Sequence, residues 1–135
     1  MDQHPIIDYR LLVDNLTTAI LLVDCHLNIF YLNSSCETLF DISLLRASGQ
    51  PVMNILHAPN DQFNTHEALL NTLKIGQAYT RREATINVNF KDKHVDYSVS
   101  QINTGKPYHP LLMIEINAID RMLKITKEEN LIQQH

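Results

Sequence analysis

Seven histidines and two cysteines are the residues of this 135-residue chain whose types could support metal or thiol chemistry. Protein zinc sites draw ligands from close pairs, such as two histidines one helical turn apart or two nearby cysteines. No two histidines stand four residues apart, and Cys25 and Cys36 are too far apart to form a ligand pair. We therefore expect no metal site and no bound cofactor.

Side chains that could act as nucleophiles or as acid and base catalysts also lack a recognisable arrangement. Ser34, Ser35 and Ser43 are not embedded in a Gly-x-Ser-x-Gly turn, and the three glycines form no phosphate-binding loop. The carboxylates, among them the pair Glu128 and Glu129, have no second catalytic group at a spacing typical of an active site. We expect no catalytic residues, and hence no enzyme activity, in these 135 residues.

Composition and charge narrow the class of protein further. A net charge of -4 gives no basic surface for nucleic acid, so we expect no nucleic-acid partner. The longest apolar run, residues 19–23, is far shorter than the roughly 20 residues that span a bilayer. With two cysteines and no secretory signal pattern, the chain is expected to be cytoplasmic, and its length is that of one domain.

The first half of the chain predicts a helix, a pair of strands and a second helical region. Residues 6–16 follow helical spacing, with an apolar stripe that must be buried somewhere, by this chain or by a second copy. We name Ile6, Ile7, Leu11 and Leu12 as a candidate dimer surface. Strands are predicted at 17–24 and 27–32, one of the polar residues 33–35 caps a short helix, and short helical turns follow to residue 64.

The second half predicts one longer helix and three strands. Residues 65–75 have helical spacing, with Thr65 as N-cap and Gly76 just past the end. Residues 80–90 alternate, which places Ala84, Ile86, Val88 and Phe90 on one face of a strand. A turn at 91–93 leads to strands at 94–103 and 111–118. Strands in runs with helices between them predict an α+β fold.

Two further sets of residues are candidates for function. Residues 119–134 are predicted to form a helix with imperfect heptad spacing, typical of a two-stranded linker. Its candidate signalling residues are Ile119, Met122, Leu123, Thr126 and Ile132. If a pocket lies between the sheet and the helices of residues 41–75, the candidate lining is Leu22, Phe30, Leu69, Ile86 and Tyr97.

The order of elements and the run Asn28-Ile29-Phe30-Tyr31-Leu32-Asn33-Ser34-Ser35-Cys36-Glu37-Thr38-Leu39-Phe40 resemble the PAS family. In this family a strand ends at Asn and a short helix carries a Leu-Phe-like pair. The resemblance implies a five-stranded antiparallel sheet with short helices on one face, plus N-terminal and C-terminal helices. It divides the chain into an N-terminal helix (1–16), a PAS sensor domain (17–118) and the start of a linker helix (119–135).

A closer resemblance is to the N-terminal sensor domain of nitrogen-regulation histidine kinases of the NtrB family. It is carried by residues 16–24, 76–85 and 111–116. It implies a sensory and dimerising module of a two-component kinase that phosphorylates and dephosphorylates a response regulator under control of a PII-type signal protein. The family's phosphoacceptor histidine box and ATP-binding motifs do not occur here, so no catalytic residue is assigned. The alternative is a PAS sensor that binds a small molecule or cofactor.

Overall fold

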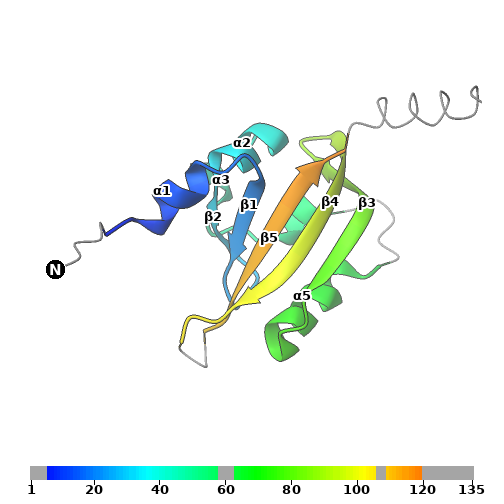
Figure 1. Ribbon diagram of the computed structural model, residues 1–135. Coiled ribbons are helices and arrows are strands. Elements are labelled where there is room, and N and C mark those ends of the chain that lie inside the picture. The colour runs from blue at the N-terminus through cyan, green and yellow to red at the C-terminus, as the bar shows by residue number, and fades with distance from the viewer. Residues whose placement is uncertain (1–5, 58–62, 106–108, 120–135) are drawn as a thin grey trace, which may run out of the picture.

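The computed structural model of the chain describes residues 6–57, 63–105 and 109–119. Its framework is one five-stranded antiparallel sheet with the strand order β2-β1-β5-β4-β3. The strands are β1 (Ala19–Val23), β2 (Ile29–Leu32), β3 (Tyr79–Val88), β4 (Lys91–Ile102) and β5 (Leu111–Ala118), and Figure 1 shows their arrangement. The predicted α+β fold with five antiparallel strands is confirmed.

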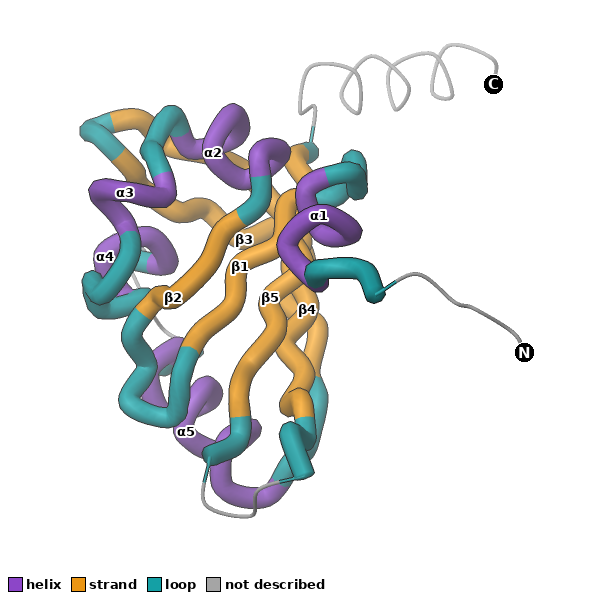
Figure 2. Tube along the Cα trace, turned by 90° about the vertical axis from the view of Figure 1, so that its left-hand side faces the viewer, coloured by secondary structure: helices purple, strands orange, loops and turns teal. Residues whose placement is uncertain are grey.

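Helices lie on both sides of this sheet, but unequally. Four of them contribute buried side chains to the core on one face: α2 (Ser34–Phe40), α3 (Leu44–Ala47), α4 (Met53–Leu56) and α5 (Thr65–Ile75). The N-terminal helix α1 (Tyr9–Asp14) contributes none and lies at the opposite side of the sheet, as Figure 2 shows. It is shorter than the predicted span of residues 6–16 because Asp8 caps its first turn and Asn15 ends it.

The apolar core is split into two clusters by the sheet. Successive side chains of a strand point to opposite faces, so a strand buried on both faces feeds both clusters. All five residues of β1 are buried. Leu21 and Val23 join the large cluster under α2–α5, whereas Ile20 and Leu22 join a small cluster on the side of α1.

The connection between β3 and β4 differs from the prediction. Ala84, Ile86 and Val88 are buried on the helix-covered face as expected, but Phe90 is fully exposed. Asn89 and Phe90 form a two-residue turn with φ of 53° and 64°, and residues 91–93, predicted as the turn, already belong to β4. Positive φ at both central residues is the geometry of a tight type I′ hairpin, which alternation in the sequence does not reveal for Phe.

The longest helix, α5, spans the predicted residues 65–75, but its ends are held differently from the prediction. Asn64, not Thr65, occupies the N-cap position, and the Thr65 hydroxyl instead accepts a hydrogen bond from Arg81 Nη1 at 3.1 Å. Gly76 ends the helix with φ of 73°, as predicted. Gln101 Nε2 donates to the carbonyl of Leu73 at 2.8 Å. A polar side chain on β4 therefore satisfies one of the open carbonyls of α5.

Candidate signalling surface

Asn33, at the end of β2, is the buried polar centre of the region where α1, α2 and the sheet meet. Its Oδ1 accepts from the backbone N–H of Ile20 at 2.9 Å and of Cys36 at 3.0 Å. Its Nδ2 donates to the carbonyls of Val13 and Thr18, both at 2.9 Å. One fully buried amide thus joins α1, β1 and the first turn of α2. The sequence predicted only a helix cap here.

Polar groups of the run 31–35 hold α1 against the domain. The Tyr31 hydroxyl donates to the Arg10 carbonyl at 3.4 Å, and the Ser34 hydroxyl donates to the Asp14 carbonyl at 3.1 Å. The Ser35 hydroxyl donates to the carbonyl of Leu16 at 2.8 Å. The two serine hydroxyls satisfy carbonyls that a helix leaves open in and after its last turn. The docking of α1 is therefore specified mainly by hydrogen bonds.

The aromatic and apolar part of this contact is small. The rings of Tyr9 and Tyr31 meet edge to face with centroids 5.9 Å apart, and Val13 packs against Ile20, Leu22 and Tyr31. Burial, followed by a hydrogen bond with Asp14, raises the pKa of the Tyr31 hydroxyl well above its usual range. The Tyr31 hydroxyl therefore stays protonated and remains a donor at neutral pH.

The start of α1 is defined by one local ion pair. Asp8 accepts from the backbone N–H of Arg10 at 2.9 Å and pairs with the Arg10 guanidinium at 2.7 Å. The hydrogen bonds from Arg10 lower the pKa of Asp8 to about 2. The carboxylate is therefore charged at neutral pH, which suits a helix N-terminus.

Several apolar side chains of α1 and of the segment that precedes it are exposed to solvent. Leu11 and Leu12 are 60% and 56% exposed, Ile7 is 47% exposed and Ile6 is fully exposed. All four residues of the candidate dimer surface are thus exposed, as are Tyr9 and Leu16, but Ile6 and Ile7 precede α1 instead of belonging to it. Exposed apolar side chains next to one another in sequence, such as Leu11 and Leu12 on a helix that is hydrogen-bonded to the domain, are typical of a protein interaction surface.

The five candidate pocket residues do not face one space. Leu69, Ile86 and Tyr97 belong to the large cluster under α2–α5 and are at most 1% exposed. Leu22 and Phe30 belong to the small cluster beside α1. The split follows from strand alternation, because Leu22 and its neighbours Leu21 and Val23 point to opposite faces of β1. The sequence could not tell which face of β1 the helices would cover.

The chain leaves the sheet beside the β3–β4 hairpin. The N–H of Ile119 donates to the carbonyl of His94 at 2.8 Å, which continues the β4–β5 pairing by one residue. Of the candidate signalling residues, Met122, Leu123, Thr126 and Ile132 lie outside the described residues, as does the predicted helix beyond Ile119.

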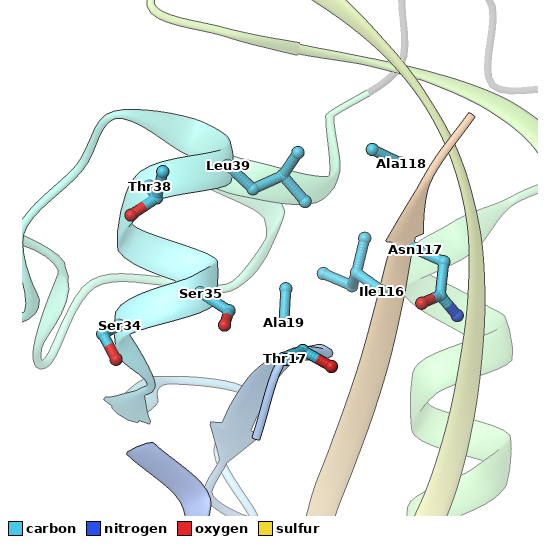
Figure 3. Close-up of a pocket in the computed structure, with 9 residues that line it drawn as sticks. All are labelled: Thr17, Ala19, Ser34, Ser35, Thr38, Leu39, Ile116, Asn117 and Ala118. Carbon is cyan, nitrogen blue, oxygen red and sulfur yellow. The ribbon is translucent and has the colours of Figure 1, made fainter. Parts of the chain in front are cut away.

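An open cleft of about 490 Å³ lies between α2 and the ends of β1 and β5. Figure 3 shows the hydroxyls of Thr17, Ser34, Ser35 and Thr38 on its walls, with Leu39 and Ile116 across from one another. Small uncharged side chains dominate this lining. Among the described residues that line it, none carries a charge that would select an ionic ligand.

Potentially reactive groups are few in the part of the chain that the structure describes. Burial raises the pKa of the Cys36 thiol to about 12, so this residue is an inert core side chain. No group of three or more metal-ligating side chains occurs among the described residues. None of the described helices has the length and apolarity that crossing a bilayer requires.

The sheet order, the four helices α2–α5 on one face and the Asn-capped α2 define a sensory domain of the PAS class. The family model of the PAS fold matches residues 7–109, and the chain belongs to this family. The resemblance predicted from the sequence is confirmed.

One curated relative of the chain is a sensor histidine kinase. Over 120 residues the chain is 29% identical to the sensory histidine kinase/phosphatase NtrB of Vibrio alginolyticus, covering 88% of this chain and 33% of that protein. The chain therefore spans about a third of the length of this curated relative.

Similar solved structures support the assignment of the chain to the PAS family. The PAS domain of nitrogen regulation protein NR(II) from Vibrio parahaemolyticus superposes with a TM-score of 0.67 at 29% identity, covering 82% of this chain and 97% of that one. The PAS domain of Bordetella pertussis BvgS gives a TM-score of 0.67 at 15% identity over 94% of this chain and 96% of that one, which supports the fold alone.

Proposed function

We propose that this chain is the sensory and dimerisation domain of a cytoplasmic nitrogen-regulation histidine kinase. In this role the domain associates through α1 with a second copy and biases the attached kinase between phosphorylating and dephosphorylating its response regulator. The resemblance to NtrB and to the NR(II) PAS domain supports the kinase context. A PII-type signal protein is the proposed upstream partner, and we propose no catalytic role for the domain itself.

The observation that carries the dimerisation proposal is that α1 is hydrogen-bonded to its own domain through its carbonyls while its leucine side chains stay exposed. Its carbonyl end is bound by Tyr31, Asn33 and Ser34, whereas Leu11 and Leu12 are more than half exposed. Hydrogen bonds to the rest of the same domain fix the orientation of α1 without burying Leu11 and Leu12. A second copy that presents the same leucines would bury them, as a two-fold interface requires.

The packing on the sheet face that α2–α5 cover favours this proposal over the small-molecule alternative. Leu69, Ile86 and Tyr97, which would line a pocket on that face, are buried in one continuous cluster with side chains of α2–α5. Opening a ligand cavity there would require these side chains to separate. The exposed leucines of α1 require no such rearrangement.

Light scattering of the chain of residues 1–135 tests the dimer. We expect a dimer that becomes a monomer in the double variant Leu11→Glu/Leu12→Glu, because two charges would be buried at the interface. Leu45→Glu is the matched control, since Leu45 is 91% exposed on a different short helix. Circular dichroism checks that all variants fold.

Two results would contradict the proposal: a wild-type chain that is monomeric at every concentration, or a dimer that Leu45→Glu dissociates as strongly as the double variant. A dimer that weakens when residues 119–135 are removed would support a contribution of the linker. Visible absorbance that copurifies with the protein would favour the cofactor-binding alternative.

A further inference from the structure

The short helix α2 is hydrogen-bonded at both ends to other parts of the domain. At its start, the side chains of residues 33–35 donate to carbonyls of α1 and of the residues just after it, at 2.8 to 3.1 Å. At its end, Asn89 Nδ2 donates to the carbonyls of Phe40 at 3.4 Å and of Asp41 at 3.1 Å. Figures 1 and 2 show α2 between α1 and the turn that joins β3 to β4. This helix therefore connects α1 with the β3–β4 hairpin.

The same hairpin lies where the chain leaves the sheet. The N–H of Ile119 donates to the carbonyl of His94 at 2.8 Å, one residue beyond the end of β5. Nδ1 of the His94 ring lies 3.1 Å from the Thr85 hydroxyl, so the two strands of the hairpin are also joined at this level. Residues 89–94 thus link the end of α2 to the hydrogen bond that follows β5.

The contact between the hairpin and α2 joins two turns with left-handed backbone. Asp41 at the end of α2, and Asn89 and Phe90 in the hairpin, have φ of 52°, 53° and 64°. Asp and Asn tolerate this conformation, but it strains a bulky residue such as Phe. Phe90 is also fully exposed, so its ring gains nothing from burial that would offset the strain. Strain persists where surrounding contacts enforce it. Strand pairing holds this turn from one side and the bonds of Asn89 hold it from the other, so loss of those bonds lets the turn relax.

The seven residues of α2 form a rigid connection, about 10 Å long, between these two sets of bonds. Cys36 and Phe40 anchor the helix in the large core cluster. Packed helices shift as units, by about 1–2 Å in known transitions. A displacement of the first turn of α2 therefore also moves the carbonyls of Phe40 and Asp41. Because the bonds from Asn89 are already 3.4 and 3.1 Å long, a shift of that size breaks them.

We propose that α2 and Asn89 couple the position of α1 to the end of β5. With α1 docked, α2 holds the hairpin through Asn89, and the hydrogen bond between Ile119 and His94 is stable. When α1 is displaced, α2 shifts, the bonds of Asn89 break, the hairpin turn relaxes and the Ile119 bond opens more often. This coupling acts within one copy of the chain. Its use in signalling rests on the proposed function, in which a second copy bound to α1 supplies the displacement.

Hydrogen exchange of backbone amides, measured by NMR on residues 1–135, tests the coupling. The double variant Ser34→Ala/Ser35→Ala removes two donors to the carbonyls of Asp14 and Leu16. We expect it to lower the protection of the Ile119 N–H by about fivefold, at the lower end of coupling between sites in proteins.

Two controls separate this effect from a general loss of stability. The amide of Val99, in the middle of β4, reports global unfolding, so the change at Ile119 is expressed relative to the change at Val99. Ser43→Ala is the matched variant, because it removes a serine hydroxyl from the N-cap of α3, outside the proposed connection. It should leave the ratio of the two protection factors unchanged.

The role of Asn89 has its own test. Asn89→Gly removes the side-chain donor but accepts the left-handed backbone. It should lower the protection of Ile119 by itself, and adding the Ser34→Ala/Ser35→Ala changes should then have no further effect. Phe90→Gly keeps the donor and relieves the strain, so it should raise the protection of Ile119.

Three outcomes would overturn the proposal. They are no effect of Ser34→Ala/Ser35→Ala on Ile119, an equal effect of this double variant with and without Asn89, and a wild-type Ile119 amide that exchanges as fast as an unstructured peptide. A chain that light scattering shows to be monomeric would contradict the dimer proposed above, whereas these exchange rates would still decide the coupling.

Discussion

The side-chain oxygen of Asn33 accepts a hydrogen bond from the backbone N–H of Ile20 at 2.9 Å, across a gap of 13 residues in the sequence. The backbone N–H of Asn33 in turn donates to the Ile20 carbonyl at 3.0 Å. Asn33 therefore takes part in the β1–β2 pairing with both its backbone and its side chain. The same amide reaches Val13, so the position of α1 depends directly on how β1 and β2 are joined.

Replacing Asn33 by Ala should lower the free energy of unfolding by about 2 to 4 kcal/mol, because the buried Ile20 and Cys36 N–H groups lose their acceptor. Urea denaturation measures the change. Asn54→Ala is the matched control, since this exposed asparagine makes only a 3.5 Å contact with Gln50. Equal midpoints for the two variants would contradict the central role of Asn33.

Replacing Gly76 by Ala should destabilise the domain more than replacing Gly49 by Ala. Both glycines have positive φ, and a left-handed alanine costs about 1 kcal/mol. At Gly76 the added Cβ would also lie 3.1 Å from Gln101 Oε1, whereas at Gly49 it meets nothing within 4 Å. Thermal unfolding of the two variants gives the comparison. A larger loss for Gly49→Ala would mean that the Gln101 contact with the end of α5 is unimportant.

Replacing Tyr97 by Phe should leave the free energy of unfolding unchanged or raise it by about 1 kcal/mol. The Tyr97 hydroxyl is buried and makes no hydrogen bond within the described part of the chain, so its removal relieves a desolvation cost. Tyr31→Phe is the contrast, because it removes a donor to the Arg10 carbonyl. A clear loss of stability in Tyr97→Phe would reveal a polar partner for this hydroxyl and favour the ligand-binding alternative.

The two cysteines should differ in their reaction with iodoacetamide. Cys25 is partly exposed and should be alkylated at pH 8, whereas Cys36 is fully buried and should react only after unfolding. Mass spectrometry of the modified peptides distinguishes the two sites. Early alkylation of Cys36 would show that α2 opens readily.

The pKa of Cys36 also predicts how stability depends on pH. Burial raises it from 9.0 to about 12, so the folded state holds the proton more tightly than the unfolded state. Its contribution to stability is complete below pH 9 and is lost as the pH rises from 9 toward 12. Cys36→Ser should weaken this alkaline loss in urea titrations. An unchanged alkaline profile in that variant would assign the loss to other groups.

Periodicity in the sequence was sufficient to predict the strands and the longest helix. Alternation over residues 80–88 and apolar residues at 111–116 indicate half-buried strands, because a sheet with one covered face requires that pattern locally. Gly76 marks the end of α5, since few residues other than glycine accept the left-handed conformation there. The cap of α2 is equally local: the sequence predicted that one of residues 33–35 fills it, and the structure identifies Asn33, whose side chain binds an N–H three residues later.

Tertiary structure alone decided the contacts between distant segments. The strand order, which places β1 between β2 and β5, depends on pairings that no local pattern encodes. The same holds for the side chains: Leu22 lies on the side of α1, Leu69 lies in the opposite cluster, and Phe90 is exposed. Propensity and periodicity report on neighbours in sequence. The docking of α1 depends instead on hydrogen bonds between its last carbonyls and side chains about 20 residues away, and such bonds exist only once the sheet has formed.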